Sequence, residues 1–354
     1  MKLLYAYNNF LKNPAFKSTY EDVNVYKEIY KVDADGWLVD RTGTVTFPWQ
    51  TALLKQYKHI EKTPSYNFET CCLLNATKYI ESSRPLILMW SGGIDSTAMV
   101  VAFLKVAKNL SNITIAFNND SIREYPLFYK NYICGKIKGI STEELILKIT
   151  TSGIGDAILL SAEHADQLFG SPLAGGIAQT LGLDFLTKPF GRDNFRTLFT
   201  SKGVTERSAD CWFDIYNETA KLSPKPILTM FDMAWWHGFN FRWQAIGMKI
   251  YPRINSNIEF KTFYSDSLFQ QWSIDQTFNM DSISQLKTIP KDFIFEFTDD
   301  ANYYNNKIKH PSSTLYYAKP AASAILEDFT KLPKLDIMNH YDLDNSIAIW
   351  LKTH

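Results

Sequence analysis

The sequence predicts an α/β protein in which a parallel sheet is flanked by helices. The first observation is an apolar run at Leu86–Trp90 that leads into the turn Ser91–Thr97 and then into a helix-like run at Ala98–Leu110. The second is a short apolar run at Ile113–Phe117, and the third is another at Ala157–Leu160 that ends in a polar turn. Strand, turn, helix and strand in this order form the unit from which parallel sheets are built.

Composition limits the classes of protein to be considered. The chain has 354 residues, of which 45% are hydrophobic and 15% aromatic, enough for a large core. It carries 37 basic and 37 acidic residues, so we do not expect a broad nucleic-acid surface, and only a local basic patch stays open. Its four cysteines show no zinc-binding spacing, which argues for a reducing compartment. No secretion signal and no apolar run of about 18 residues is present, so we expect a cytoplasmic protein without a membrane partner.

Residues 1–82 are predicted to form a small unit of mixed α and β structure. We expect two strands, a hairpin and two helices, at 3–11, 23–32, 33–49, Thr51–Ile60 and Phe68–Ile80. Asp35-Gly36 and Thr42-Gly43 are turn pairs that suit the hairpin. On the second helix, Cys71 and Cys72 are expected to be buried apolar filler rather than a redox pair.

Residues 83–200 are predicted to form the α/β core, and residues 201–354 a mainly helical region that completes an active-site cleft. Within the core we also expect a strand at Lys136–Ile140, a helix at Thr142–Thr150 and a helix that begins at Gln167.

One stretch of the helical region, Thr229–Gln244, is rich in aromatic side chains and is expected to be core rather than the wall of a substrate pocket. Within it, Arg242 is the residue best suited to meet an anion, since a guanidinium grips carboxylates and phosphates.

The turn after the first strand has the chemistry of a phosphate-binding loop. Gly92 and Gly93 allow unusual backbone dihedrals and the close approach of a ligand. Ser91, Ser96 and Thr97 offer hydroxyl groups. The N-terminus of the following helix offers unpaired N–H groups and the positive end of a dipole.

Asp95, in the middle of this loop, indicates a cation. A carboxylate beside a phosphate is repulsive unless a cation lies between them, and Mg²⁺ is the ion that suits both. No lysine follows the second glycine, so the loop is not of the Walker type. The alternative is a tight strand–helix turn closed by a capping Asp or Ser. The combination of apolar strand, SGGxDS and helix favours the phosphate interpretation.

A second acid, Asp166, follows the run at Ala157–Leu160. If the two strands are neighbours, Asp95 and Asp166 both reach one Mg²⁺ on a pyrophosphate group. In sheets of this kind the nucleotide base packs by the end of the second strand, which makes Ala116 and Phe117 candidates for that contact. Burial in the core explains these two residues equally well.

Two of these segments resemble a known superfamily. Pro85–Thr97 resembles the pyrophosphate loop of the N-type ATP pyrophosphatases, and Leu160–Ser171 is similar to the segment LSGEGADELFGG of the asparagine synthetase family, which includes the β-lactam synthetases. The resemblance implies a core of the adenine nucleotide alpha hydrolase type, ATP at Ser91–Thr97 and Asp166 as a metal ligand. The chain departs from the motif at Ala162, His164, Gln167 and Ser171. For His164 a surface or supporting position is favoured over a new phosphate contact.

A third segment, Glu259–Asp266, is similar to the family's ExRxPFLD, with Lys261 in place of the arginine. The resemblance implies that Glu259 lines the cleft and assists proton transfer, while a helix-capping acid on the surface is the alternative. The family also uses a late lysine to neutralise charge on the adenylate and pyrophosphate. Lys309 is the preferred candidate for that role, ahead of Lys307.

The resemblance therefore implies an ATP-dependent ligase. With ATP and Mg²⁺ it would adenylate a small-molecule carboxylate, release pyrophosphate and pass the acyl group to ammonia or an amine. The chain begins without the cysteine that opens glutamine-using members, so we do not expect it to hydrolyse glutamine. Two alternatives stay open: a nucleobase-modifying enzyme of the tRNA-thiolating or deazaguanine-nitrile-forming type, and a non-catalytic ATP-binding homologue. A homodimer is a candidate assembly.

Overall fold

The computed structural model describes residues 3–4, 25, 28–33, 38–45, 64–150, 155–243, 259–277, 287–307 and 325–326. The chain groups into two compact units, each assembled from separate segments. The sheet unit consists of Ile60–Phe169 and Ile250–Pro311, and the helical unit of Met1–His59, Gly170–Lys249 and Ser312–His354. The three consecutive ranges expected from the sequence, 1–82, 83–200 and 201–354, do not coincide with these interleaved units.

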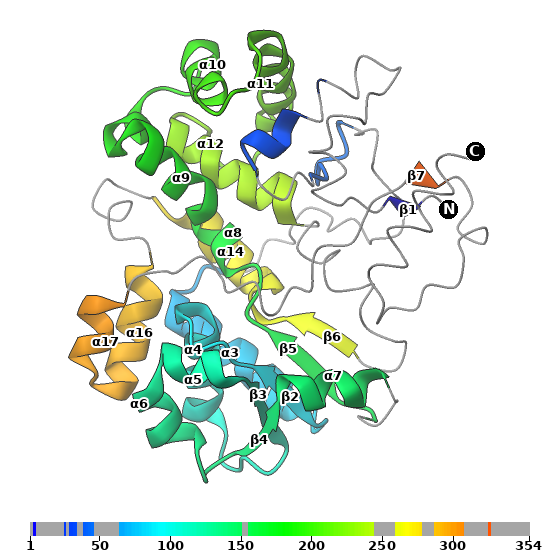
Figure 1. Ribbon diagram of the computed structural model, residues 1–354, viewed down its shortest axis with the longest axis vertical. Helices are drawn as coiled ribbons and strands as arrows, with labels where there is room; N and C mark the ends of the chain where they lie inside the picture. Colours follow the sequence, from blue (N-terminus) through cyan, green and yellow to red (C-terminus); the bar gives the residue numbers. More distant parts are fainter. Residues whose placement is uncertain are drawn as a thin grey trace. The chain divides into compact units, whose positions relative to one another are not determined.

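The sheet unit contains five parallel strands, which confirms the predicted α/β class with a parallel sheet (Figure 1). In spatial order the strands are β4 (Lys138–Ser141), β3 (Ile113–Phe117), β2 (Leu86–Met89), β5 (Ile158–Ser161) and β6 (Glu259–Thr262). The first four lie within two residues of their predicted positions. The fifth strand was not predicted, because its four residues do not alternate clearly enough to be distinguished from a loop.

The strand order creates a switch point beside β2. The chain moves outward from β2 to β3 and β4, and then returns to build β5 and β6 on the other side. Leu86 of β2 pairs with Ile113 of β3 on one side and with Ile158 of β5 on the other. In open α/β sheets the crevice outside the carboxyl ends of the two strands at such a point is where ligands bind.

Both faces of the sheet are buried. One face forms a cluster that includes a residue of α7 (Thr142–Thr150), composed of Ile87, Ala116, Ile140, Leu145, Ala157 and Leu159. Leu86 and Leu88, which alternate with Ile87 along β2, are 1% and 0% exposed on the opposite face. A parallel strand that is apolar on both faces needs helices on both sides, which explains the uninterrupted apolar run in the sequence.

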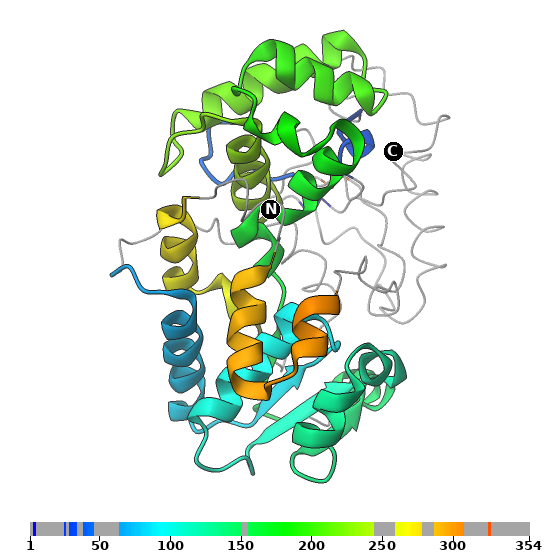
Figure 2. The ribbon, with the colours of Figure 1, turned by 90° about the vertical axis from the view of Figure 1, so that its left-hand side faces the viewer.

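The other helices and helical turns of the sheet unit are α3 (Phe68–Glu81), α4 (Ile94–Val106), α5 (Asn119–Glu124), α6 (Pro126–Phe128), the π-helix η2 (Tyr129–Ile133), α8 (Ala165–Phe169), the 3₁₀ turn η6 (Phe263–Ser265), α14 (Ser267–Asp275), α16 (Thr288–Thr298) and α17 (Ala301–Asn306). Helix α4 packs between α3 and α16, and α17 follows α16 closely (Figures 1 and 2). The predicted helices α3 and α7 are confirmed. Helix α4 begins four residues before the expected Ala98, because the turn is complete at Gly93.

The helical unit comprises the 3₁₀ turn η1 (Glu28–Lys31), α9 (Ser171–Leu181), the 3₁₀ turn η3 (Leu183–Thr187), α10 (Arg192–Ser201), α11 (Glu206–Ala220), α12 (Met230–Trp236) and the π-helix η4 (His237–Arg242). It also holds the antiparallel pair β1 (Leu3–Leu4) and β7 (Ile325–Leu326). Among the described residues, no helix has both the length and the apolar character needed to cross a bilayer.

Two predictions for the N-terminal segment are wrong where the structure describes it. The strand expected at 23–32 is a 3₁₀ turn at Glu28–Lys31, because the carbonyl oxygen of Ile29 accepts local hydrogen bonds from the N–H groups of Val32 (2.9 Å) and Asp33 (2.8 Å). Within the expected hairpin, residues 38–45 form a turn without strands. The Asp40 carboxylate collects the N–H groups of Thr42 (3.0 Å) and Val45 (2.8 Å) that a ladder would use. The expected helix Thr51–Ile60 lies outside the described residues.

The aromatic stretch is core, as predicted. Trp235, Phe241 and Trp243 are all 0% exposed. The anion that Arg242 meets is internal, since its Nε lies 3.0 Å from Oδ2 of the buried Asp33. The same oxygen lies 2.7 Å from Nε2 of His237. Arg242 therefore stabilises the interior of the helical unit. Cys71 and Cys72 of the sheet unit are also buried, as expected, and are free thiols.

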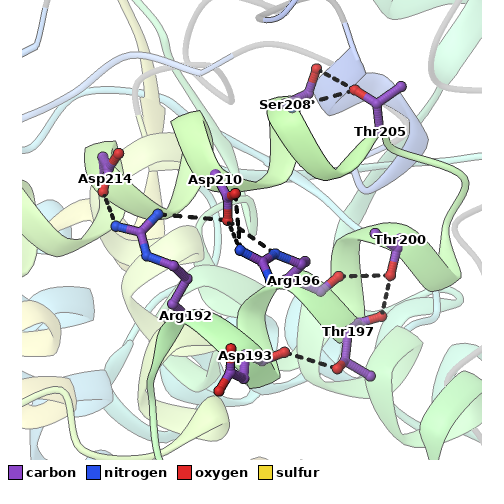
Figure 3. A network of polar contacts seen from close by, with 9 residues as sticks. All are labelled: Arg192, Asp193, Arg196, Thr197, Thr200, Thr205, Ser208, Asp210 and Asp214. Carbon is purple, nitrogen blue, oxygen red and sulfur yellow. Dashed lines mark hydrogen bonds and ion pairs between the residues drawn. The ribbon is translucent and has the colours of Figure 1, made fainter.

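Helices α10 and α11 are joined by a network of charged side chains (Figure 3). The Arg196 guanidinium donates to both oxygens of Asp210, with distances of 2.9 and 3.0 Å from Nη2. Arg192 donates to Asp214 at 2.5 Å and lies 3.6 Å from Asp210. Asp210 is thus the carboxylate shared by both arginines, whereas Asp214 has one partner in this network.

We expect Asp210→Ala to lower the free energy of unfolding by about 1 kcal/mol, because it removes a two-oxygen contact to a half-buried guanidinium. Urea denaturation at low and high salt measures this loss, which should shrink as salt screens the pair. Asp214→Ala is the matched control on the same helix and should have the smaller effect. Equal losses in the two variants would contradict the shared-carboxylate arrangement.

Candidate functional site

The turn after β2 has a backbone that only glycine accommodates. Gly92 has φ +74°, in the left-handed region. A Cβ atom at this position would lie 2.7 Å from Cβ of Glu124 and still closer to the carbonyl oxygen of Ser121. Both constraints exclude a side chain, so α5 and the turn can approach each other closely.

The hydroxyl groups of the turn are part of its internal hydrogen bonding. Ser91 Oγ and Ser96 Oγ lie 2.9 Å apart, and Ser96 Oγ donates to the carbonyl oxygen of Gly93 at 3.1 Å. Thr97 is 0% exposed, and its Oγ1 accepts a 3.1 Å hydrogen bond from Trp90 Nε1. Of the three predicted hydroxyls, only that of Ser91 belongs to an exposed residue.

The N-terminus of α4 is open for an anion. Gly93 is the N-cap residue, so no side chain caps the helix, contrary to the alternative of a turn closed by a capping Asp or Ser. The first N–H groups of a helix have no acceptor within it. In a 13-residue helix these groups add to the positive end of the helix dipole.

The two predicted acids converge on one cation. Asp95 lies in the first turn of α4, and Asp166 in the first turn of α8, just after β5. Their Oδ1 atoms both contact Nζ of Lys287, Asp166 at 2.7 Å and Asp95 in a still closer ion pair. The predicted meeting of Asp95 and Asp166 is therefore present in the structure, and an ammonium group lies between them.

Lys287 was not predicted as a site residue. It precedes α16, and its side chain is 1% exposed, with Nζ also 5.3 Å from the ring centroid of Phe169. Its φ of +76° is a strained conformation for lysine. Burial by itself would lower the pKa of Lys287, but the Asp166 and Asp95 carboxylates outweigh burial and raise that pKa. The lysine is therefore charged at neutral pH. Nothing in its sequence neighbourhood separates it from surface lysines.

The turn that carries Asp166 is held by His164. His164 is 1% exposed, which excludes the surface position, and its Nδ1 lies 2.7 Å from Thr262 Oγ1 at the end of β6. It has φ +72°, at a position where the similar motif has glycine. A glycine would take this conformation without strain. The histidine side chain compensates by linking the turn to the neighbouring strand.

The lysines near the C-terminal end of the sheet unit include Lys307, which lies close to the turn after β2. Lys307, at the end of α17, forms a close ion pair with Glu124, the residue that adjoins Gly92. Lys291, one turn after Lys287, is half-buried, and desolvation together with the positive charge of Lys307 lowers its pKa. Lys309, the preferred candidate, lies outside the described residues. Lys307 thus lies near the turn through Glu124, and its charge acts on Lys291 of α16.

Glu259 does not join this cluster. It is the first residue of β6 and pairs with Ile158, the first residue of β5, so it lies at the amino end of the parallel strands. Asp95 and Asp166 follow the carboxyl ends, about 10 Å away along strands of this length. There Glu259 binds Arg84 and, at 2.6 Å, Lys261, and its pKa is lowered by Lys261 and Arg84. Glu259 thus lies at the end of the sheet opposite to Asp95 and Asp166, whereas the resemblance implied a position in the cleft.

The two residues predicted to contact the nucleotide base, Ala116 and Phe117, differ in their exposure. Ala116 is 1% exposed and belongs to the core cluster. Phe117, the last residue of β3, is partly exposed, and its ring centroid lies 5.2 Å from that of Tyr129 and 6.5 Å from that of Trp90. An aromatic group at the carboxyl end of β3 is compatible with base packing, so Phe117 keeps that predicted role.

The two carboxylates would supply only part of a magnesium coordination shell. Among the described residues, no three His, Cys, Asp or Glu side chains group closely enough to hold a metal by themselves. Asp95 and Asp166 offer carboxylate oxygens, and Mg²⁺ characteristically takes one or two carboxylates and completes its shell with phosphate oxygens and water. The two acids fit this pattern, provided that Lys287 moves from between them towards the phosphates.

We expect Lys287→Met to lower the free energy of unfolding by about 2 kcal/mol, less than the roughly 3–5 kcal/mol for a fully buried pair, because the two carboxylates keep some contact with water. Mg²⁺ at millimolar concentration should restore part of this loss in Lys287→Met and have little effect on the unaltered protein. Chemical denaturation with and without Mg²⁺ measures both.

Lys291→Met is the matched control for this experiment. It makes the same substitution one turn further along α16, where the lysine is desolvated beside another cation, and should cause no loss of stability. If Lys287→Met were as stable as the control and insensitive to Mg²⁺, the two carboxylates would not converge in solution.

Compared with known proteins, the sequence matches no family model and no curated protein.

Proposed function

We propose that this protein is an ATP-dependent ligase that adenylates a substrate carboxylate, releases pyrophosphate and transfers the acyl group to ammonia or an amine. The observation that carries the proposal is the convergence of Asp95, Asp166 and Lys287 beside the open N-terminus of α4. Two acids and a lysine at this point suit a group that carries both a strong negative charge and a divalent cation, as a magnesium-bound triphosphate does.

In the proposed first step, an oxygen of the substrate carboxylate attacks the α-phosphorus of ATP. The bond from the α-phosphorus to the oxygen bridging to the β-phosphorus breaks, and pyrophosphate leaves with that electron pair. In the second step the amine nitrogen attacks the acyl carbon, AMP leaves, and the nitrogen gives up a proton. The contribution of the protein is mainly positioning and charge neutralisation.

The described residues divide this work. The turn and the first N–H groups of α4 would hold the phosphate chain, and Lys287 would neutralise the charge that develops on the leaving pyrophosphate. Asp95 and Asp166 would hold Mg²⁺, which when bound supplies further charge neutralisation at the phosphate oxygens. Glu259 receives no role, because it lies at the other end of the strands. A role for Lys309 stays a prediction.

A second candidate is an ATP-binding protein without catalysis. It is favoured by the ammonium group that lies between the two acids, since Lys287 satisfies both carboxylates without any metal. In such a protein the lysine would take the place of the magnesium ion permanently. The two candidates differ in one measurable respect, which is whether ATP binding depends on Mg²⁺ and is followed by cleavage.

Exchange of labelled pyrophosphate into ATP in the presence of a pool of carboxylic acids tests the ligase. We expect Asp95→Asn and Asp166→Asn each to reduce the exchange rate by at least about 100-fold, because each removes a charge that the magnesium-bound triphosphate requires. Both variants should fold, since an amide keeps the shape of the carboxylate.

Asp156→Asn is the control, because Asp156 is an exposed acid paired with Arg84 at the amino end of the sheet. It should exchange pyrophosphate at the unaltered rate. Magnesium-independent ATP binding without any exchange would favour the second candidate, and the absence of both binding and exchange would exclude both.

A further inference from the structure

Tyr303, in the short helix α17, has a buried hydroxyl group to which the described part of the chain offers no hydrogen-bond partner. The residue is 6% exposed, and its hydroxyl oxygen has no donor or acceptor in hydrogen-bonding geometry among the described residues. Most buried polar atoms in folded proteins are paired, so an orphan of this kind calls for a physical explanation. Loss of the hydroxyl's hydrogen bonds to water is unfavourable unless a ligand replaces them.

The ring of Tyr303 is held firmly in place. It stacks on Tyr125, with ring centroids 3.7 Å apart and an angle of 10° between the planes. Its backbone N–H donates to the Asp300 carboxylate at 2.9 Å, which fixes the start of α17. Tyr125 in turn ends α5, the helix that Gly92 approaches. The hydroxyl therefore has a defined position relative to the phosphate-binding turn.

The orphan hydroxyl lies beside Thr97, in the first turn of α4. Neither Thr97 nor any other described residue is in hydrogen-bonding geometry to it. The charges of Asp95 and Glu124 act on it as well. Burial, with the charges of Asp95 and Glu124, raises the pKa of Tyr303 well above its ordinary value, so the hydroxyl keeps its proton at neutral pH. It is thus a hydrogen-bond donor that finds no acceptor in the described ranges, near a helix N-terminus that no side chain caps.

We infer that the Tyr303 hydroxyl is a ligand-binding group that donates a hydrogen bond to a phosphoryl oxygen of the pyrophosphate part of the nucleotide, held at the N-terminus of α4. The inference rests on the proposed function and adds to the nucleotide site a residue that lies outside the three motif segments of the sequence. Lys307 lies one turn further along the same chain segment, so the phosphate would meet a neutral donor and an ammonium group from α17 together.

Tyr303→Phe tests the inference directly, because phenylalanine keeps the stacked ring and removes only the orphan oxygen. Without ligand, the variant should unfold at the same temperature as the unaltered protein or a higher one. With Mg²⁺ present, its affinity for ATP and for inorganic pyrophosphate should fall about tenfold, the effect of one hydrogen bond to a charged group. Its affinity for AMP, which lacks the pyrophosphate part, should not change.

Tyr304→Phe is the matched control in the same helix. The Tyr304 hydroxyl is exposed and donates to Asp292 at 2.8 Å, so its loss should leave all three affinities unchanged. Calorimetric titration of the full chain with magnesium and ATP, pyrophosphate or AMP, together with thermal unfolding of the ligand-free protein, gives every quantity required.

The outcomes separate the inference from the proposal on which it rests. If the unaltered protein binds ATP, Asp95→Asn does not, and Tyr303→Phe binds as tightly as the unaltered protein, the inference is overturned and the proposed function stands. If Tyr303→Phe loses affinity and also unfolds at a lower temperature without ligand, the hydroxyl has an internal partner and the inference is again overturned. If the unaltered protein binds neither ATP nor pyrophosphate, both are wrong.

Discussion

Two carboxylates and one buried ammonium group meet at the carboxyl edge of the sheet, and the candidate site depends on this contact. Neither acid is fully buried, but Lys287 is, and an ammonium group without partners would be strongly destabilised there. The acids therefore make the position of the lysine acceptable, and the lysine prevents the two acids from repelling each other. A group that displaced the lysine would have to offer the two acids another positive charge.

The topology of the sheet brings these groups together. Asp95 and Asp166 are 71 positions apart by their residue numbers (166 − 95), yet the strands that precede them, β2 and β5, are direct neighbours. Because both strands run in the same direction, both turns emerge at the same edge. The same rule separates Glu259 from the site, since it begins its strand instead of following it. Position along a parallel strand thus decides which acids can act together.

Backbone strain is stored at two positions around the site, His164 and Lys287, which have positive φ angles without being glycine. Gly92 has a similar φ angle without strain, and its missing Cβ avoids a clash with α5. Strained residues of this kind persist where the surrounding contacts determine them, and they cluster at functional sites. The conformation of His164 is held by its contact with Thr262, and that of Lys287 by its ion pairs with Asp95 and Asp166. The strain and the polar contacts therefore belong to one arrangement.

The sequence by itself determined the class of the fold, four of the five sheet strands, the glycine-containing turn after β2 and the pair of acids. These are properties of local pattern: an apolar strand buried on both faces is a continuous run, and a turn that needs glycine contains one. Only the tertiary structure decided that Lys287 lies between the acids, that Glu259 lies at the amino end of its strand and that Arg242 meets the internal Asp33. It also decided that the Tyr303 hydroxyl has no hydrogen-bond partner among the described residues. A lysine, a glutamate, an arginine and a tyrosine look the same in sequence whether they are exposed or buried. Their roles follow from which distant charges the fold places beside them.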